Sequence, residues 1–281
     1  MISIGKLRSV DYYEREVVDG REDYYVDARE AVGRWSGTLA EKLGLTGTVD
    51  SDALRAAFEG RHPVTGERLS LTNSSMPGFD LTLSVPKSYS VLWALGDPDD
   101  IRAVETAIHT AQQEAERYLA STACLVRRGH AGESVQPGQG FVGATFLHRT
   151  SRAGDPGLHI HWVVLNVTEG PDGRRTALDG RALYRERYTA EAIFQARLRY
   201  EMARSTGVLF DEVDRHGVAE IAGIDKTVRR EFSQRRRRIE AEMAARGVTG
   251  GRGPRPTRLA GGGATGAVNL SVARTRDRRS G

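Results

Sequence analysis

Alternating apolar and polar positions predict several short strands. In residues 78–85 every second side chain is apolar, and the polar positions between them include Asp80. Successive side chains of a strand point to opposite faces, so this segment is expected to be half-buried, with a carboxylate on its polar face. Residues 1–8 alternate in a similar way and predict an opening strand. Further strands are expected in 123–135, at 208–213 and at 218–221.

Apolar residues at helical spacing predict the helices. The clearest case is 99–121, where Ile101, Val104 and Ile108 begin a repeating apolar face and Asp97 favours the N-terminus. Shorter helices are expected at 31–43 and 50–58, a longer one from 188 to 207, and a basic helix over 226–246.

Three of the seven histidines fall within fourteen residues. His159 and His161 are two apart in a run of β-forming residues, so both project from one face of a strand. His148 closes the preceding apolar run, and the turn-forming segment 150–157 predicts a hairpin that can bring it beside the other two. A single strand histidine is usually a hydrogen-bonded, partly buried residue. Three neutral imidazoles on one face suit a catalytic divalent metal without naming it.

Tyrosines form two acidic-flanked doublets near the start of the chain, Tyr12-Tyr13 and Tyr24-Tyr25. Aromatic packing would explain an arbitrary doublet. A nucleophilic role requires a nearby metal or base, because a free phenol has a pKa of about 10 and is mostly protonated at neutral pH. Nothing near the doublets in sequence supplies one, but the histidine cluster could.

Composition permits a polyanionic partner without proving one. The 281 residues are 39% hydrophobic and 28% charged, and the net charge of +4 with a pI near 9.3 reflects abundant arginine. Arginines concentrate in the expected basic helix, where Arg235 and Arg238 belong to a run that is either a solvated face or a phosphate-binding surface. The single cysteine, Cys124, excludes an intramolecular disulfide and suits the cytoplasm. No signal peptide, membrane span or Gly-x-x-x-x-Gly-Lys-Ser/Thr loop is found.

Several motifs together resemble the relaxase domain of MobF-class conjugative relaxases, the TrwC/TraI type of the HUH endonuclease superfamily. The tyrosine doublets resemble its paired nucleophile motif, residues 79–88 resemble its acidic-strand motif, and residues 148–161, followed by Asn166, resemble its histidine motif. The motifs occur in the family's order. Ile160 stands where a threonine is common, on the side away from the metal.

The resemblance implies an α+β fold, with a central antiparallel sheet flanked by helices and C-terminal helical fingers over a DNA cleft. Residues 1–246 would form the relaxase domain and 247–281 a flexible Gly/Arg-rich tail or linker. Family members usually continue into a helicase, which is not expected within these 281 residues, so the sequence would be one domain of a longer protein, the product of a truncated gene or a standalone relaxase. A monomer is expected, with no membrane insertion.

The resemblance also implies a reaction, namely site-specific nicking and strand transfer on single-stranded DNA. A divalent metal, Mg²⁺ or Mn²⁺ before Zn²⁺ or Ni²⁺, would bind His148, His159 and His161. Tyr12 would attack the scissile phosphate, with Tyr13 beside it, and Tyr24 or Tyr25 would serve a second transfer. Asp80 would orient a ligand histidine or assist deprotonation. The expected DNA-binding residues are Lys87, Arg152, Arg235 and Arg238.

The implied DNA is an origin of transfer with a hairpin and a nick site, and relaxosome accessory proteins and a coupling protein are possible partners. One alternative is a rolling-circle replication initiator or transposase of the same superfamily, but these usually place the tyrosine after the histidine motif. Another is a non-catalytic DNA-binding module with structural zinc, which would be four-coordinate and closed. A cupin-like enzyme acting on a small molecule would leave the tyrosine doublets and basic helix without a role.

Overall fold

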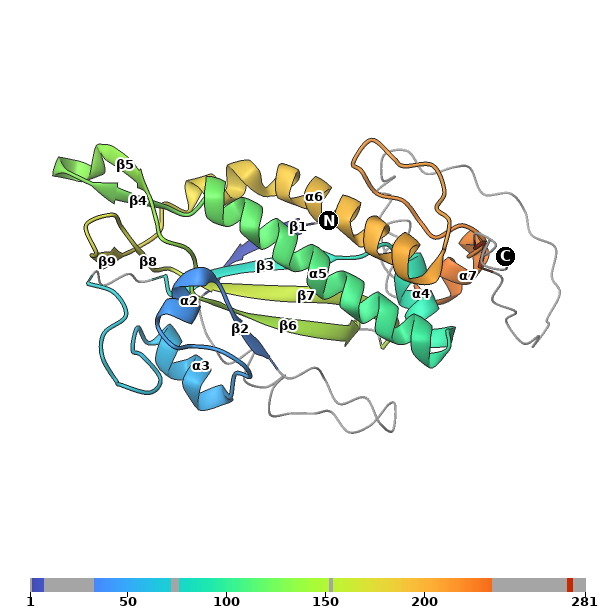
Figure 1. Cartoon of the computed structure of the whole chain (residues 1–281), viewed down its shortest axis with the longest axis horizontal. Helices are drawn as coiled ribbons and strands as arrows, with labels where there is room; N and C mark the ends of the chain where they lie inside the picture. The colour runs from blue at the N-terminus through green and yellow to red at the C-terminus, as the bar shows by residue number, and fades with distance from the viewer. Residues whose placement is uncertain (1, 8–32, 72–75, 152–153, 234–271, 275–281) are drawn as a thin grey trace, which may run out of the picture.

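A five-stranded antiparallel sheet forms the centre of the molecule (Figure 1). The computed structural model describes residues 2–7, 33–71, 76–151, 154–233 and 272–274. In spatial order the strands are β1 (Ile2–Lys6), β3 (Gly78–Ser84), β7 (Pro156–Leu165), β6 (Gly143–Thr150) and β2 (Arg34–Ser36). Every neighbouring pair is antiparallel, so the expected α+β class with a central antiparallel sheet is confirmed. The expected C-terminal fingers lie outside the described residues.

Three helices cover one face of the sheet. They are α4 (Lys87–Leu95), α5 (Pro98–Thr122) and α6 (Arg181–Thr206), and Figure 1 shows α5 and α6 running side by side. Leu81, Ile160 and Trp162 point toward these helices and are almost fully buried. These three residues occupy the apolar phase of their strands, and the polar residues between them therefore face the other way.

The opposite face is apolar at one end and polar at the other. At the apolar end, Leu7, Phe146 and Val163 pack in a smaller core with residues of α2 (Thr38–Lys42) and α3 (Ser51–Phe58). At the polar end, β3, β7 and β6 present the hydroxyl, carboxylate and imidazole groups from which the candidate site is built. The polar groups that could bind a metal or react are therefore gathered at one end of this sheet face.

The prediction of a helix at 31–43 is wrong over its first half. Residues Arg34–Ser36 form strand β2, which pairs with β6, and the short helix α2 begins only at Thr38. Gly37 separates the two elements with a φ of 102°, in the region that favours glycine. A side chain there would also collide with the carbonyl of Phe141. Apolar spacing alone did not reveal this break.

Two small hairpins lie beyond the sheet at the left of Figure 1. Their strands are β4 (Leu125–Arg128) with β5 (Ser134–Pro137), and β8 (Thr168–Glu169) with β9 (Arg175–Thr176). A 3₁₀ turn at His130–Gly132 precedes β5. The strand expected in 123–135 is present, whereas the pair expected at 208–213 and 218–221 is reduced to one bridge between Phe210 and Ile221.

Part of the segment expected to be a flexible tail is bound to the domain. Ala273 exchanges backbone hydrogen bonds with Leu209 and Ala222, and Arg274 donates to both carboxylate oxygens of buried Asp100 at 2.8 and 2.7 Å. Helix α7 (Lys226–Glu231) covers only the first six residues of the basic helix expected over 226–246; it ends at Glu231 with Phe232 as its C-cap, and residues 234–246 lie outside the described residues. No helix in the described parts of the chain is both long and apolar enough to cross a membrane.

Candidate metal centre and active site

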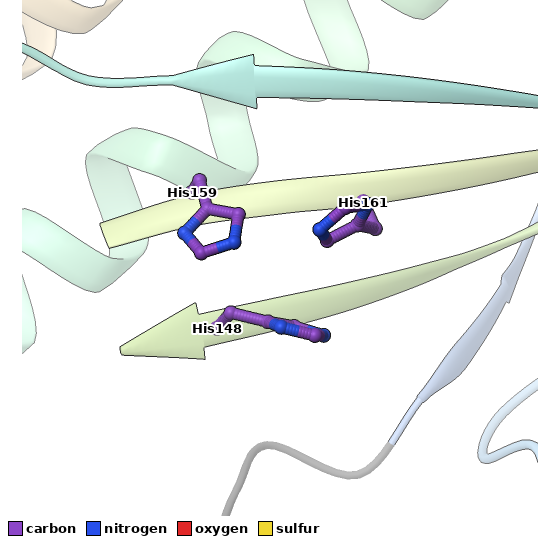
Figure 2. A group of neighbouring side chains, drawn as sticks. All are labelled: His148, His159 and His161. Atoms are coloured by element: carbon purple, nitrogen blue, oxygen red, sulfur yellow. The ribbon is translucent and has the colours of Figure 1, made fainter. Parts of the chain in front are cut away.

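Three imidazoles converge on the polar face of the sheet, as Figure 2 shows. In the β6–β7 hairpin His148 lies directly opposite His159, and His161 follows His159 by one full strand period. One ring nitrogen from each histidine lies within 4.8 Å of the others. Ligand nitrogens about 2.1 Å from one ion lie at most about 4.2 Å apart, so the cluster is close to the spacing of a metal site. The hairpin predicted from the sequence thus brings the three histidines together.

Two of the imidazoles are oriented through Nδ1. Both carboxylate oxygens of Asp80 lie 2.9 Å from His161 Nδ1, and the Thr82 hydroxyl lies 3.4 Å from it. His159 Nδ1 lies 2.6 Å from the carbonyl oxygen of Gly157. Because an acceptor oxygen requires Nδ1–H, both rings are set in the tautomer whose unprotonated Nε2 can bind a metal. Asp80 therefore lies where a carboxylate is expected to orient a ligand histidine.

Burial keeps the third imidazole neutral. The pKa of His148 falls to about 3, first because the side chain is desolvated and then because it faces His161 and His159, while Asp80 opposes the shift. A metal binds the neutral imidazole, so protons do not compete for this ligand near neutral pH. Three clustered imidazoles, one of them paired with Asp80, fit a divalent cation.

The other expected site residues are placed only in part. Lys87, expected to bind DNA, lies at the start of α4 and donates to the carbonyl oxygen of Pro156 in the histidine hairpin. Burial lowers the pKa of Lys87, against the influence of Asp155 and Glu220. The tyrosine doublets and three expected DNA-binding arginines lie outside the described residues: Tyr12, Tyr13, Tyr24, Tyr25, Arg152, Arg235 and Arg238.

Some contributors to the site were not anticipated from the sequence. Thr82 could have been found, because it follows Asp80 by two residues on the same strand face. The carbonyl of Gly157 could not, since no side-chain pattern marks a backbone acceptor. Asn166, which follows the histidine motif in sequence, does not contact the histidines in these hydrogen bonds: it joins neighbouring segments by donating to the Met76 carbonyl and accepting from the Leu178 amide.

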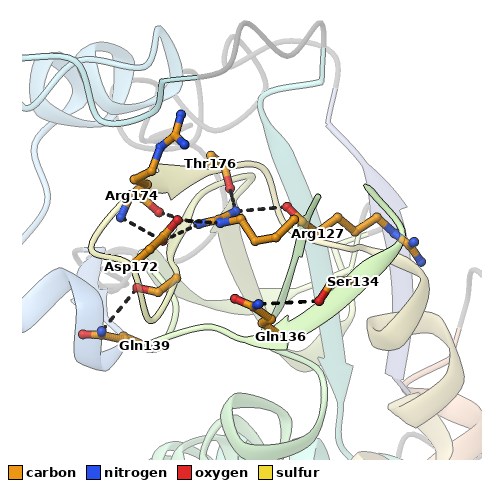
Figure 3. A network of polar contacts seen from close by, with 9 residues as sticks. Arg127, Ser134, Gln136, Gln139, Asp172, Arg174 and Thr176 are labelled. Carbon is orange, nitrogen blue, oxygen red and sulfur yellow. Dashed lines mark hydrogen bonds and ion pairs between the residues drawn. The ribbon is translucent and has the colours of Figure 1, made fainter. Parts of the chain in front are cut away.

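A separate polar network connects the two small hairpins at the far end of the molecule (Figure 3). Arg128 of β4 binds both carboxylate oxygens of Asp172 at 2.9 Å, the Thr176 hydroxyl at 2.8 Å and the Arg174 carbonyl at 2.9 Å. The hydrogen bond from Arg128 lowers the pKa of Asp172 to about 2. These contacts fix the hairpins to each other and are structurally distinct from the histidine centre.

Comparison with known proteins places the chain in a family. A sequence profile described as TrwC relaxase matches residues 7–280. The multifunctional conjugation protein TraI of Escherichia coli K12 is 34% identical over 237 residues, which are 80% of this chain and 13% of TraI. A second Escherichia coli TraI is 36% identical over the same length and coverage. The chain thus spans a small part of the curated relatives it matches.

Solved structures show the same likeness in three dimensions. A metal-bound structure of the conjugative relaxase TrwC in complex with oriT DNA matches with a TM-score of 0.74 and 30% identity, over 89% of this chain and 85% of TrwC. TrwC complexed with a 27-mer DNA comprising the recognition hairpin and the cleavage site matches with a TM-score of 0.72 and 28% identity, over 89% and 84%. The chain therefore belongs to the TrwC relaxase family of DNA relaxase enzymes, as a MobF-class relaxase domain.

Proposed function

We propose that this chain nicks single-stranded DNA at an origin of transfer and transfers the strand through a 5′-phosphotyrosyl intermediate. The observation that carries the proposal is the cluster of His148, His159 and His161, with Asp80 orienting one of them, on the polar end of a sheet face in a relaxase-family fold. The metal-bound and DNA-bound TrwC structures support the same assignment. Relaxosome accessory proteins and a coupling protein are the proposed partners of a monomeric, cytoplasmic enzyme.

The histidine cluster would hold the metal through three imidazole nitrogens. A bound divalent cation supplies Lewis-acid stabilisation of charge on the non-bridging oxygens of a scissile phosphate. Imidazole ligands alone favour Zn²⁺ or Ni²⁺, whereas Mg²⁺ or Mn²⁺ prefers oxygen, which phosphate can provide. We propose Mg²⁺ or Mn²⁺ as the physiological ion, with Zn²⁺ or Ni²⁺ as the alternative that a metal-affinity series would detect.

Asp80 acts on His161 in this proposal and is not the base for the nucleophile. Both of its carboxylate oxygens are 2.9 Å from His161 Nδ1. A carboxylate committed in this way stabilises one imidazole tautomer and one ring orientation. Of the two roles expected from the sequence, orientation is therefore the one that the geometry favours.

The proposed nucleophile is Tyr12, and the chain has the reach to bring it to the histidines. Leu7 lies four residues beyond Ser3, and Ser3 shares a row of the sheet with Thr82 and His161. Four residues along β1 and two strand spacings across the sheet correspond to a separation of about 17 Å. The five residues from Leu7 to Tyr12 can extend about 17 Å before the side chain is added.

The chain also returns beside the histidines after the second doublet. Gly33, the first described residue after Tyr25, lies so close to Phe146 that a side chain would overlap its ring. Phe146 is the partner of His161 across β6 and β7. The eight residues from Tyr25 to Gly33 span up to about 28 Å, so the chain is long enough for the second doublet to reach the histidines. We propose that this doublet performs the later transfer.

In the proposed step the phenol oxygen of Tyr12 bonds to phosphorus while the bond from phosphorus to the 3′-oxygen breaks. The phenol proton is lost, the leaving oxygen takes up a proton, and the products are a 5′-phosphotyrosyl strand and a free 3′-hydroxyl. The phosphodiester is exchanged for another ester, so rejoining by reversal needs no nucleotide hydrolysis.

The nucleophile is tested by covalent trapping on a cognate single-stranded oligonucleotide with Mg²⁺ or Mn²⁺. Tyr12→Phe removes only the attacking oxygen and is expected to abolish the adduct. Tyr13→Phe is expected to matter less, and Tyr24→Phe is expected to spare the first cleavage while impairing later transfer. Peptide mapping of the DNA-linked protein by mass spectrometry identifies the residue. An adduct on Tyr24 or Tyr25 would reverse the proposed order, and no tyrosine adduct under any metal would leave the DNA-binding module as the better explanation.

A further inference from the structure

Glu220 connects two elements at the histidine end of the molecule. One carboxylate oxygen accepts a hydrogen bond of 2.8 Å from the backbone amide of Ser88, and the other lies 2.9 Å from a guanidinium nitrogen of Arg229 in α7. Glu220 is partly exposed and lies in the loop pair that follows α6. Its position was not marked by any motif in the sequence.

The contact with Ser88 completes the start of α4. This helix has Pro86 at its N-cap position, and no side chain caps it from within its own sequence. Glu220 supplies an anionic acceptor for an amide of the first turn, where helices have unsatisfied donors and a positive partial charge. The hydroxyl of Ser88, which is fully buried, accepts in return from the Ile221 amide at 2.8 Å. The first turn of α4 is thus fixed by a reciprocal pair of hydrogen bonds.

The same turn of α4 holds the beginning of β7. Lys87 donates to the Pro156 carbonyl, and the buried hydroxyl of Ser90 accepts from the Leu158 amide at 3.0 Å. The residue between these two anchors is Gly157, whose carbonyl lies 2.6 Å from His159 Nδ1. One contact from α4 therefore holds the peptide unit whose carbonyl orients the His159 imidazole, and the other holds the peptide unit before it.

We propose that Glu220 is a positioning residue of the histidine centre, acting through the first turn of α4 on the backbone that orients His159. The inference deepens the proposed function and depends on it, because it assigns the cluster a metal. Glu220 touches neither the imidazoles nor the reacting atoms. Its negative charge is balanced by Arg229, so the carboxylate is held by α7 on one side while it holds α4 on the other.

The test measures Co²⁺ binding by calorimetry and visible absorption, without DNA. Removing a direct outer partner of a metal ligand typically weakens binding 10–100-fold, and Glu220 acts through one further layer, so Glu220→Ala is expected to weaken Co²⁺ binding about three- to tenfold. Glu220→Gln keeps an oxygen for the Ser88 amide and is expected to recover much of the loss. Glu212→Ala, at an exposed acid of the same loop pair, is the matched control.

Long-range ¹H–¹⁵N NMR of the histidine rings separates positioning from general destabilisation. The Nδ1–H signal of His159 is expected to change in Glu220→Ala, while that of His161, held by Asp80, is expected to persist. If Glu220→Ala does not fold, Ser90→Ala breaks the next contact of the same path and is expected to have the same two effects.

The outcomes separate this inference from the proposed function. Co²⁺ binding that is lost in His161→Ala but equal in Glu220→Ala and Glu212→Ala would overturn the role of Glu220 alone. Weakened binding with an unchanged His159 signal would also overturn it. Failure of the unaltered protein to bind Co²⁺, or binding that is indifferent to His161→Ala, would remove the metal centre itself and this inference with it.

Discussion

At the scale of single residues, the pairing of Asp80 with His161 is the most informative contact in the site. A carboxylate acceptor at Nδ1 leaves Nε2 as the electron-pair donor and fixes the orientation of the ring. His159 Nδ1 has an uncharged acceptor instead, the backbone carbonyl of Gly157. The two imidazoles are therefore oriented by different means, and only the orientation of His161 can be altered by a side-chain substitution at its partner.

We expect Asp80→Asn to weaken divalent-metal binding about 10–100-fold, in the range typical of such outer partners. The Asn amide can either accept from a protonated Nδ1 or donate to an unprotonated Nδ1. The variant therefore no longer selects the Nδ1–H tautomer. Calorimetric titration with Mn²⁺ measures the change, and Asp52→Asn on the exposed start of α3 controls for the lost charge. Equal affinities of the two variants would show that Asp80 does not orient a ligand.

At the scale of elements, alternation in 78–85 and the runs of apolar and β-forming residues on either side of the 150–157 turn were enough to predict the strands that carry the site. β3 has one apolar and one polar phase, so the facing of Asp80 followed from the sequence, and the two-residue spacing of His159 and His161 placed both on one face of β7. β2 was missed because three residues are too few to show the two-residue period of a strand. Its residues were included in an expected helix, although Gly37, with a φ of 102°, separates β2 from α2. The backbone contacts of α4 were not predictable, since they join residues about 70 positions apart.

Glu116 of helix α5 makes the free energy of unfolding depend on pH. Burial raises the pKa of Glu116 to about 7, although the amide of Gln112 donates to it at 2.8 Å. The folded protein thus favours the protonated acid. Its contribution is fully present below the unfolded-state pKa of about 4.3 and is lost as pH rises toward 7.

We expect Glu116→Gln to raise the free energy of unfolding at pH 8 by about 1–3 kcal/mol, since one pKa unit corresponds to about 1.4 kcal/mol. The gain should shrink toward pH 4, where Glu116 is protonated in both states. Chemical denaturation across this pH range provides the measurement. Glu114→Gln, two residues away and paired with Arg117, is the control, and an identical pH trend in both variants would contradict the assignment.

At the scale of the whole molecule, the family and the central sheet were predictable because the motifs mark the strands that pair. The order of the strands was not, because β1, β3 and β7 meet across long sequence separations that no local pattern records. The attachment of Arg274 to Asp100 was unpredictable for the same reason. The basic run beyond 233 and the domain boundary at 246 remain predictions.

We expect Arg235→Ala combined with Arg238→Ala to weaken binding of single-stranded DNA and to flatten its dependence on salt. Each lost phosphate contact should reduce the logarithmic salt slope by about 0.7. Fluorescence anisotropy over a salt series measures the affinity for single-stranded DNA and its salt slope. Arg102→Ala combined with Arg117→Ala removes the same charge from α5, where both arginines pair with neighbouring acids. An unchanged slope in the first double variant would identify the run as a solvated face.

The central position of β7 determines when the site can exist during synthesis. Until β7 emerges from the ribosome, the native pairings open to the other strands are β1 with β3 and β2 with β6, and no native pairing joins these two pairs into one sheet. β7 begins 72 positions after β3 ends, which is about 4–14 s of translation. The strand that joins the two pieces is also the one that carries His159 and His161. Closure of the sheet and assembly of the histidine centre therefore depend on the same strand.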